Sequence, residues 1–134
     1  MNNSLTKDQK AVAALVLTGL SLLQNGRYAE ALPYLNEYIS MLEGLNQPLT
    51  ADDAIYYYNR SVAKVGLDDI DGAIEDLNKC VAISKIHQAY FQLFKLHDFK
   101  RDSRAALDAL IDAYENGNTE AEAILREHTN YFNR

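Results

Sequence analysis

Residues 54–84 read AIYYYNRSVAKVGLDDIDGAIEDLNKCVAIS, which is the pattern of two helices separated by a short break. The first helix is rich in aromatic residues and runs through Lys64, and the break is Gly66-Leu67-Asp68-Asp69. A second helix is predicted from about Ile70 to Ile83. Its apolar residues recur at the spacing of one helix face, at Ala73, Ile74, Leu77 and Val81. The stretch therefore predicts two antiparallel helices.

The same stretch resembles a tetratricopeptide repeat, a helix–turn–helix unit of about 34 residues. In that family an aromatic residue stands early in the first helix, a small residue follows one turn later, and alanines occupy fixed places in the second helix. The matching positions here are Tyr57, Ser61, Ile70, Ala73, Leu77 and Cys80. The resemblance implies a scaffold that binds proteins, and it does not name a partner because such repeats serve many unrelated partners.

One such unit cannot bury its own apolar face, so the interpretation requires neighbouring repeats. Upstream, the template is matched by Gly19, Leu22, Gly26, Tyr28, Ala31, Leu32 and Leu35. Downstream, it is matched by Tyr90, Leu93, Ala106, Leu107, Leu110 and Ala113. The second-helix alanines Ala31, Ala73 and Ala106 are 42 and 33 residues apart, so the first junction carries roughly eight extra residues.

We therefore expect an all-α fold: a right-handed α-solenoid of three helix pairs plus a capping helix, seven helices in a single domain over residues 1–134. The repeats are expected at about 12–44, 54–85 and 87–117, and the capping helix at about 119–132. Its apolar stripe is Ala121, Ile124, Leu125, His128 and Phe132.

Cap residues predict several helix ends. Thr6 with Gln9 is a capping-box pattern that places the first helix start near Lys7, and Asn25-Gly26 should end that helix. Thr50 with Asp53 and Thr119 with Glu122 are similar pairs. The remaining helices are expected at about 29–43, 86–98 and 103–115.

Two large residues stand where the family usually has a small one. They are Tyr38 in the second helix and Phe94 in the fifth. A small residue at these places lets two helices approach closely. We therefore expect looser packing at Tyr38, and at Phe94 either a splayed pair or compensation by Ala105 and Ala109.

Composition fits a soluble helical protein of ordinary hydrophobicity. The chain is 48% hydrophobic and 24% charged, and thirteen basic against nineteen acidic residues give a net charge of −6. This charge disfavours nucleic acid and anionic membrane surfaces as partners and favours basic or apolar ones. The lone cysteine, Cys80, is expected to be a small buried hydrophobe.

The location that we expect is the cytoplasm. The apolar run 11–23 follows Lys7 and Lys10 and could instead be a signal peptide. Against that alternative, Asp8 interrupts the basic region, Arg27 and Glu30 lie where a cleavage site would be, and the run already fits the first repeat helix. The run is also too short to span a bilayer.

The sequence offers no pattern for catalysis. It has no glycine-rich phosphate loop, no nucleophile elbow, and no paired cysteines or histidines at metal spacing. His87, His97 and His128 are scattered, and the acidic group Asp68, Asp69, Asp71, Glu75 and Asp76 lacks the register of a calcium loop. Asp69 and Asp71 are interpreted as cap and dipole complement of the fourth helix, and the others as a solvated face. We expect no enzyme activity, no cofactor and no metal.

The resemblance places the binding surface on the concave side, which the first helix of each repeat lines in this family. By register that surface presents Val16, Leu17, Leu20, Tyr58, Asn59, Val62, Phe91, Gln92 and Lys95. Tyr58 and Phe91 are expected to be partly exposed aromatic anchors on one wall, and Asn59 to bond a peptide backbone. A long row of exposed apolar side chains normally marks a binding surface.

Several interpretations of this groove follow. Family members that hold the carboxyl terminus of heat-shock chaperones use a clamp of lysine, asparagine and arginine, of which only Asn59 is present, with Val16, Gln88 and Gln92 at the basic places. That role is rejected. The leading hypothesis is a non-enzymatic adaptor for an apolar peptide; the alternative is a small acidic chaperone for a hydrophobic secretion substrate. The groove could also be covered by the N-terminal segment, the long first junction or a second copy in a homodimer.

Overall fold

The computed structural model describes residues 5–133, and within this range the chain forms helices without strands. The seven helices of this range are α1 (Lys7–Gln24), α2 (Tyr28–Gly44), α3 (Ala51–Gly66), α4 (Ile70–Ile83), α5 (His87–Phe99), α6 (Ser103–Glu115) and α7 (Thr119–His128). The all-α prediction is confirmed, and α4 and α6 have the bounds predicted from the sequence.

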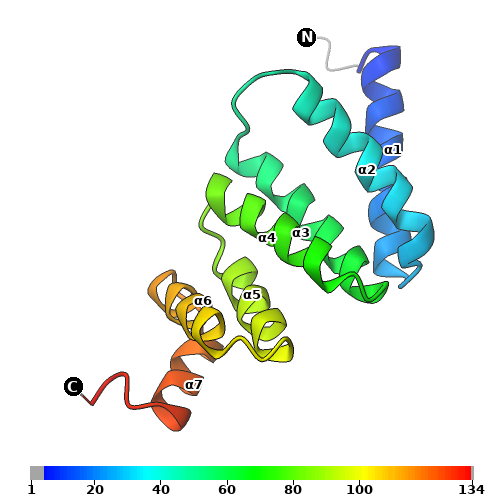
Figure 1. Ribbon diagram of the computed structural model, residues 1–134. Helices are drawn as coiled ribbons and strands as arrows, with labels where there is room; N and C mark the ends of the chain where they lie inside the picture. Colours follow the sequence, from blue (N-terminus) through cyan, green and yellow to red (C-terminus); the bar gives the residue numbers. More distant parts are fainter. Residues whose placement is uncertain (1–4, 134) are drawn as a thin grey trace.

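The helices pack as three antiparallel pairs, α1 with α2, α3 with α4, and α5 with α6 (Figure 1). Each pair also contacts the next one, through α2 against α3 and through α4 against α5, and α7 packs on α6. The chain is thus a right-handed α-solenoid of three helix pairs closed by a seventh helix. None of the described helices combines the length and the apolar character needed to cross a bilayer.

The turn inside each pair repeats the same backbone device. Gly26, Asp68 and Arg101 all have positive φ, with values of 73°, 62° and 61°. They are 42 and 33 residues apart, the same spacing as the second-helix alanines. A single left-handed residue ends a helix and reverses the chain, so the three turns are equivalent. Only the first of them uses glycine, the residue that enters this conformation without a steric cost.

The helix starts follow the cap residues, with one correction. Thr6 and Gln9 form the expected capping box, and Asp69 accepts a hydrogen bond from the Gly72 backbone N–H at 3.0 Å. At α7 the cap is Asn118, which accepts from the Ala121 N–H at 2.8 Å. The predicted cap Thr119 is wrong by one residue because an asparagine immediately before it satisfies the same free N–H groups.

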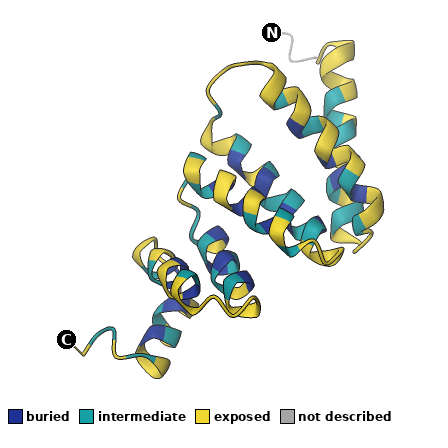
Figure 2. Ribbon diagram, viewed as in Figure 1, coloured by how far each residue is buried: buried dark blue, intermediate teal, exposed yellow. Residues whose placement is uncertain are grey.

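Among the described residues, the buried ones, dark blue in Figure 2, form three clusters along the array. The central cluster contains residues of α2, α3, α4 and α5, together with Ala109 of α6. Tyr57, Leu77 and Cys80 belong to it. A second cluster is formed by α5, α6 and α7, and a third by α1, α2 and α3. Burial raises the pKa of the Cys80 thiol to about 11, in agreement with the expected small buried hydrophobe.

The two large residues at small-residue positions have different outcomes. Tyr38 turns toward the next pair and packs on Tyr56 of α3, with ring centroids 4.4 Å apart. Phe94 packs between the central and C-terminal clusters, where the small Ala109 lies in the core. The α5–α6 pair is therefore closely packed and not splayed. Of the two outcomes expected at Phe94, compensation by a small residue is the one found.

The capping helix is shorter than predicted. It ends at His128, and Phe132 lies beyond the helix with its ring 5.3 Å from the ring of Tyr114. Ala121 and Leu125 are buried, but His128 is exposed, so its expected place in the apolar stripe is wrong. In the last turn of α7, Arg126 lies over the Phe132 ring at 4.2 Å from its centroid, and His128 faces solvent.

Asp76 corrects the interpretation of the acidic group as a solvated face. This carboxylate is 1% exposed and is bonded by Arg60 of α3 through two N–H donors, at 2.9 and 2.7 Å. The Lys64 ammonium lies 2.9 Å away, and Arg60 also donates to Asn36 of α2 at 3.2 Å. Asp76 is buried because it stands between Ala73 and Cys80 on the packed face of α4. The network connects the first two helix pairs.

Candidate partner-binding surface

The nine residues predicted for the binding surface do not form one continuous site. Val16 and Leu17 lie in an apolar groove at the N-terminal end of the array. Val62 and Gln92 line a separate, smaller hollow between α3 and α5. Leu20 and Phe91 pack into the core. The candidate surface therefore has two separate parts.

The first part, the apolar groove, has a volume of about 590 Å³. One wall is α1, which contributes Val12, Ala13, Val16 and Leu17, with Leu5 just before the helix. The other side is formed by the rings of Tyr38 and Tyr56, and the polar lining residues are Asp8 and Gln9. Leu17 is 66% exposed, although it is a large apolar residue.

The long first junction explains why the groove is open. The connection between α2 and α3 spans residues 45–50, whereas the one between α4 and α5 spans only residues 84–86. Figure 1 shows this longer connection as an arc between the separated ends of α2 and α3. Tyr38 and Tyr56 fill the separation in part, and α1 then has a side that no neighbouring helix covers. Relative to the next repeat, α2, this connection and α3 are each three residues longer, and Tyr38 of α2 and Tyr56 of α3 line the groove.

The electrostatics of the apolar groove favour a cation beside the apolar lining. Asp8 is part of the lining, and Asp53 is close enough to Tyr38 to act on its titration. Burial raises the pKa of Tyr38 most, and the neighbouring Tyr56 and the Asp53 charge raise it further. Carboxylates at the edge of an apolar surface attract a basic group, because the field there is little screened at short range.

The second part, the inner hollow, measures about 170 Å³. Val62 and Val65 of α3, Gln92 and Leu96 of α5, and the Tyr28 ring line it. Tyr58 stands beside it, half-buried against the central cluster. Burial is the main cause of its raised pKa, while a hydrogen bond with the Gln92 side chain acts in the opposite direction. The hollow is too small for more than a few side-chain atoms of a ligand.

Phe91 is not the exposed anchor that register predicts. Its side chain is 8% exposed and packs in the C-terminal cluster with Leu110 of α6 and Leu125 of α7. The equivalent Tyr58 belongs to the central cluster, so the two rings do not share one wall. The physical reason is that Leu110 and Leu125, from the last two helices, cover the Phe91 ring. The exposed Lys95 places its ammonium 5.4 Å from the Phe91 ring centroid.

Sequence reasoning also missed residues that the structure brings together. Tyr38 and Tyr56 form one side of the apolar groove and were not expected in it. The run of three tyrosines at 56–58 could have indicated this, because three consecutive helix residues point in different directions. The three rings therefore cannot all lie on one face of α3. Asn59 is half-buried on α3, and no contact of its side chain supports the predicted backbone-binding role. Among the described residues no cluster of His, Cys, Asp and Glu is placed to hold a metal ion.

Comparisons with known proteins agree with this architecture. The family model described as "Tetratricopeptide repeat" matches residues 54–87, which are most of α3, all of α4 and the first residue of α5. A solved structure titled "MamA RS-1 ArsTM double mutant" superimposes with a TM-score of 0.69 and 24% identity, covering 78% of this chain and 55% of that one. At this identity the likeness supports the fold alone. A search of curated proteins gave no significant match. Residues 54–87 are thus identified as a tetratricopeptide repeat, and the helical array around them has the fold of that solved structure.

Proposed function

We propose that the chain is a non-enzymatic adaptor that binds an apolar peptide segment of another protein in the apolar groove. The observation that carries the proposal is Leu17, which is 66% exposed inside a groove whose other walls are Val12, Val16 and two tyrosine rings. Exposed apolar surface that is contiguous with a concavity is a common feature of protein-binding sites. Aromatic side chains such as Tyr38 and Tyr56 are enriched among the residues that dominate binding energy.

The ligand is further defined by charge. Asp8 lines the groove, Asp53 lies next to it, and the whole chain has a net charge of −6. A peptide with an apolar centre and a basic residue at one flank satisfies both the apolar walls and this negative edge. A peptide with an acidic flank would meet like charges, so we expect discrimination between the two.

The chain has no tryptophan, which allows a direct binding experiment. Two synthetic peptides share one leucine- and valine-rich centre with a single tryptophan, and they differ only in flanks of lysine or of glutamate. The full chain is titrated into each peptide, and binding is measured by the fluorescence of the peptide's tryptophan. We expect the lysine-flanked peptide to bind roughly tenfold more tightly, with an advantage that shrinks at high salt because both charges are exposed.

The variant that tests the site is Leu17→Asp. Because this side chain is mostly exposed, its replacement should change the free energy of unfolding by no more than about 0.5 kcal/mol, yet it should weaken peptide binding by about 30-fold, as loss of a central contact of about 2 kcal/mol implies. The matched control is Leu45→Asp, a leucine that is 61% exposed outside the groove, which should bind like the wild type. Failure of both peptides to bind the wild type, or equal binding by Leu17→Asp, would refute the proposal.

A further inference from the structure

The outer face of the first helix pair is not covered by any other part of the described chain. Helix α1 contains the most apolar run of the sequence, yet Gly19 is its one fully buried residue. Its side away from α2 and α3 exposes Lys7, Lys10, Ala14, Thr18 and Ser21, which recur at helical spacing and so share one face. This outer face lies on the opposite side of α1 from Val12 and Val16 of the apolar groove.

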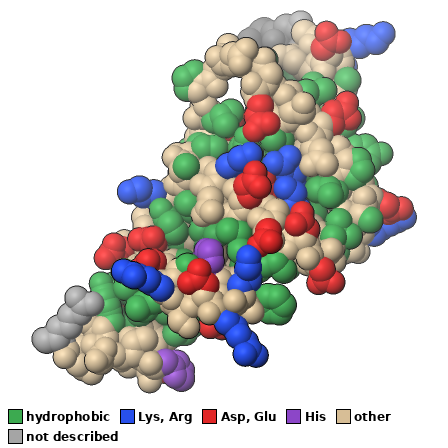
Figure 3. Space-filling model, in the orientation of Figure 1, with side chains coloured by type: hydrophobic (Ala, Val, Ile, Leu, Met, Phe, Trp, Pro, Cys, Tyr) green, Lys and Arg blue, Asp and Glu red, His purple; other side chains and the backbone are tan. Residues whose placement is uncertain are grey.

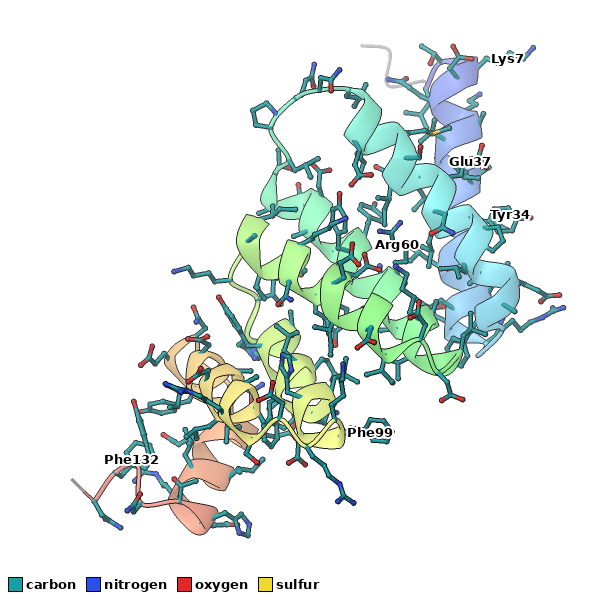
Figure 4. The ribbon with its side chains drawn as sticks, in the orientation of Figure 1. Lys7, Tyr34, Glu37, Arg60, Phe99 and Phe132 are labelled. Atoms are coloured by element: carbon teal, nitrogen blue, oxygen red, sulfur yellow. The ribbon has the colours of Figure 1, made fainter. Side chains whose placement is uncertain are left out.

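A hollow of about 610 Å³ adjoins this face. Thr18 and Leu22 of α1 form one side of it, and Glu30, Pro33, Tyr34 and Glu37 of α2 form the other. Arg27 also lines this outer hollow and is already paired with Glu30. Figure 4 shows Lys7, Glu37 and Tyr34 along the same edge of the molecule, with Lys7 at the start of α1. In Figure 3 a basic side chain lies beside an acidic one near the N-terminal end, and acidic side chains, one of them next to a basic one, follow further along this edge.

The charges of the outer face are arranged so that the face complements itself. Lys10 and Thr18 are each four residues from Ala14, on either side of it. Rotation by 180° about an axis through Ala14 and perpendicular to α1 therefore exchanges their places. The lysine of one copy then lies opposite Thr18 of the other, at the outer hollow that holds Glu37. Two such contacts form at once, as a two-fold symmetric interface requires.

We infer that this outer face is where a second copy of the chain docks, with the two α1 helices packed antiparallel across Ala14. The small side chains Ala11, Ala14 and Thr18 let the helix axes approach to about 8–10 Å. Lys10 of each copy pairs with Glu37 of the other, and both side chains are exposed in the single chain. The expected dissociation constant is on the order of micromolar, the weak end of the range for an interface of standard size.

The experiment is sedimentation equilibrium of the full chain over a range of concentrations. The mass of the wild type should rise from 15.1 kDa toward twice that value as the concentration increases. Lys10→Glu and Glu37→Lys should each weaken dimerisation roughly tenfold or more, because each places like charges together in both symmetric contacts. An equimolar mixture of these two variants should dimerise like the wild type, since every contact between unlike copies again joins opposite charges.

Two further variants complete the test. Glu127→Lys, which makes the same charge change on exposed α7, should leave the dimer unchanged. Ala14→Glu should give a monomer with an unchanged thermal midpoint, because glutamate is a good helix former at an exposed position. A wild type that remains at the mass of one chain up to its solubility limit overturns the inference. A dimer that neither charge variant weakens, or a mixture that stays monomeric, overturns it as well.

Discussion

Truncation after Gly117, which removes α7 and the residues that follow it, should unfold or aggregate the protein. Ala121 and Leu125 are fully buried against α5 and α6, and Ile124 and Phe132 pack on the same cluster. Full burial of one such large side chain contributes roughly 1.5–3 kcal/mol, so the complete loss is on the order of 5 kcal/mol. A domain of this size is stable by only about 5–15 kcal/mol.

Thermal unfolding and sedimentation of the truncated chain measure this effect. We expect loss of a cooperative transition, together with self-association through the newly exposed apolar face of α6. Leu125→Ala serves as the milder version, with an expected loss of about 2–5 kcal/mol in the free energy of unfolding. A truncated chain that is monomeric and melts at the temperature of the full chain would show that α7 does not cap the array.

Asp76→Ala should have the next largest effect. The carboxylate is buried, and its removal leaves the partly buried Arg60 and Lys64 cations beside each other without the carboxylate that they share. Breaking a buried ion pair by deleting one partner typically costs about 3–5 kcal/mol, because the remaining charge stays desolvated. The measured quantity is the free energy of unfolding from urea denaturation.

The neighbouring Glu75 provides the control. It precedes Asp76 on the same helix but is 71% exposed and pairs with Lys79 one turn away, so Glu75→Ala should stay within about 0.5 kcal/mol of the wild type. Replacing the three charges together, by Asp76→Leu with Arg60→Met and Lys64→Met, should recover much of the stability. Equal effects of Asp76→Ala and Glu75→Ala would contradict the buried network.

Local sequence signals predict the helix pairs well because their causes are local. The bounds of α4 follow from the cap at Asp69 and from an apolar face repeated every three to four residues. The spacing of Ala31, Ala73 and Ala106 is by itself enough to locate the long first junction. Tertiary packing does not enter either signal, so both can be recognised in one sequence.

The buried charges could not be predicted in this way. Asp76 belongs to an acidic run, and its burial is tolerated only because it pairs with Arg60, sixteen residues earlier on another helix. Nothing in the local pattern of α4 indicates that partner. The same holds for Tyr57, whose hydroxyl donates to Glu43 of the preceding pair at 2.8 Å.

The candidate site was predicted in part, and the errors have one cause. Register gives the direction of a side chain on its helix, and it places Val16 and Leu17 on the open side of α1, where the groove lies. Register does not say what lies opposite. Phe91 has the register of Tyr58 but meets α6 and α7, whereas α1 meets a widened junction and remains open. Exposure therefore depends on position in the array as well as on position in the repeat.

The central claim is that partner peptides bind in the apolar groove beside α1. Two-dimensional NMR of the isotope-labelled full chain, titrated with the lysine-flanked peptide, tests it most directly because it reports where the peptide lies. The largest shift changes should fall on Val12, Val16 and Leu17 and on the rings of Tyr38 and Tyr56, while the signals of Ala121 and Leu125 stay unchanged. Shift changes centred on Val62 and Gln92, or spread evenly over all three core clusters, would contradict the account.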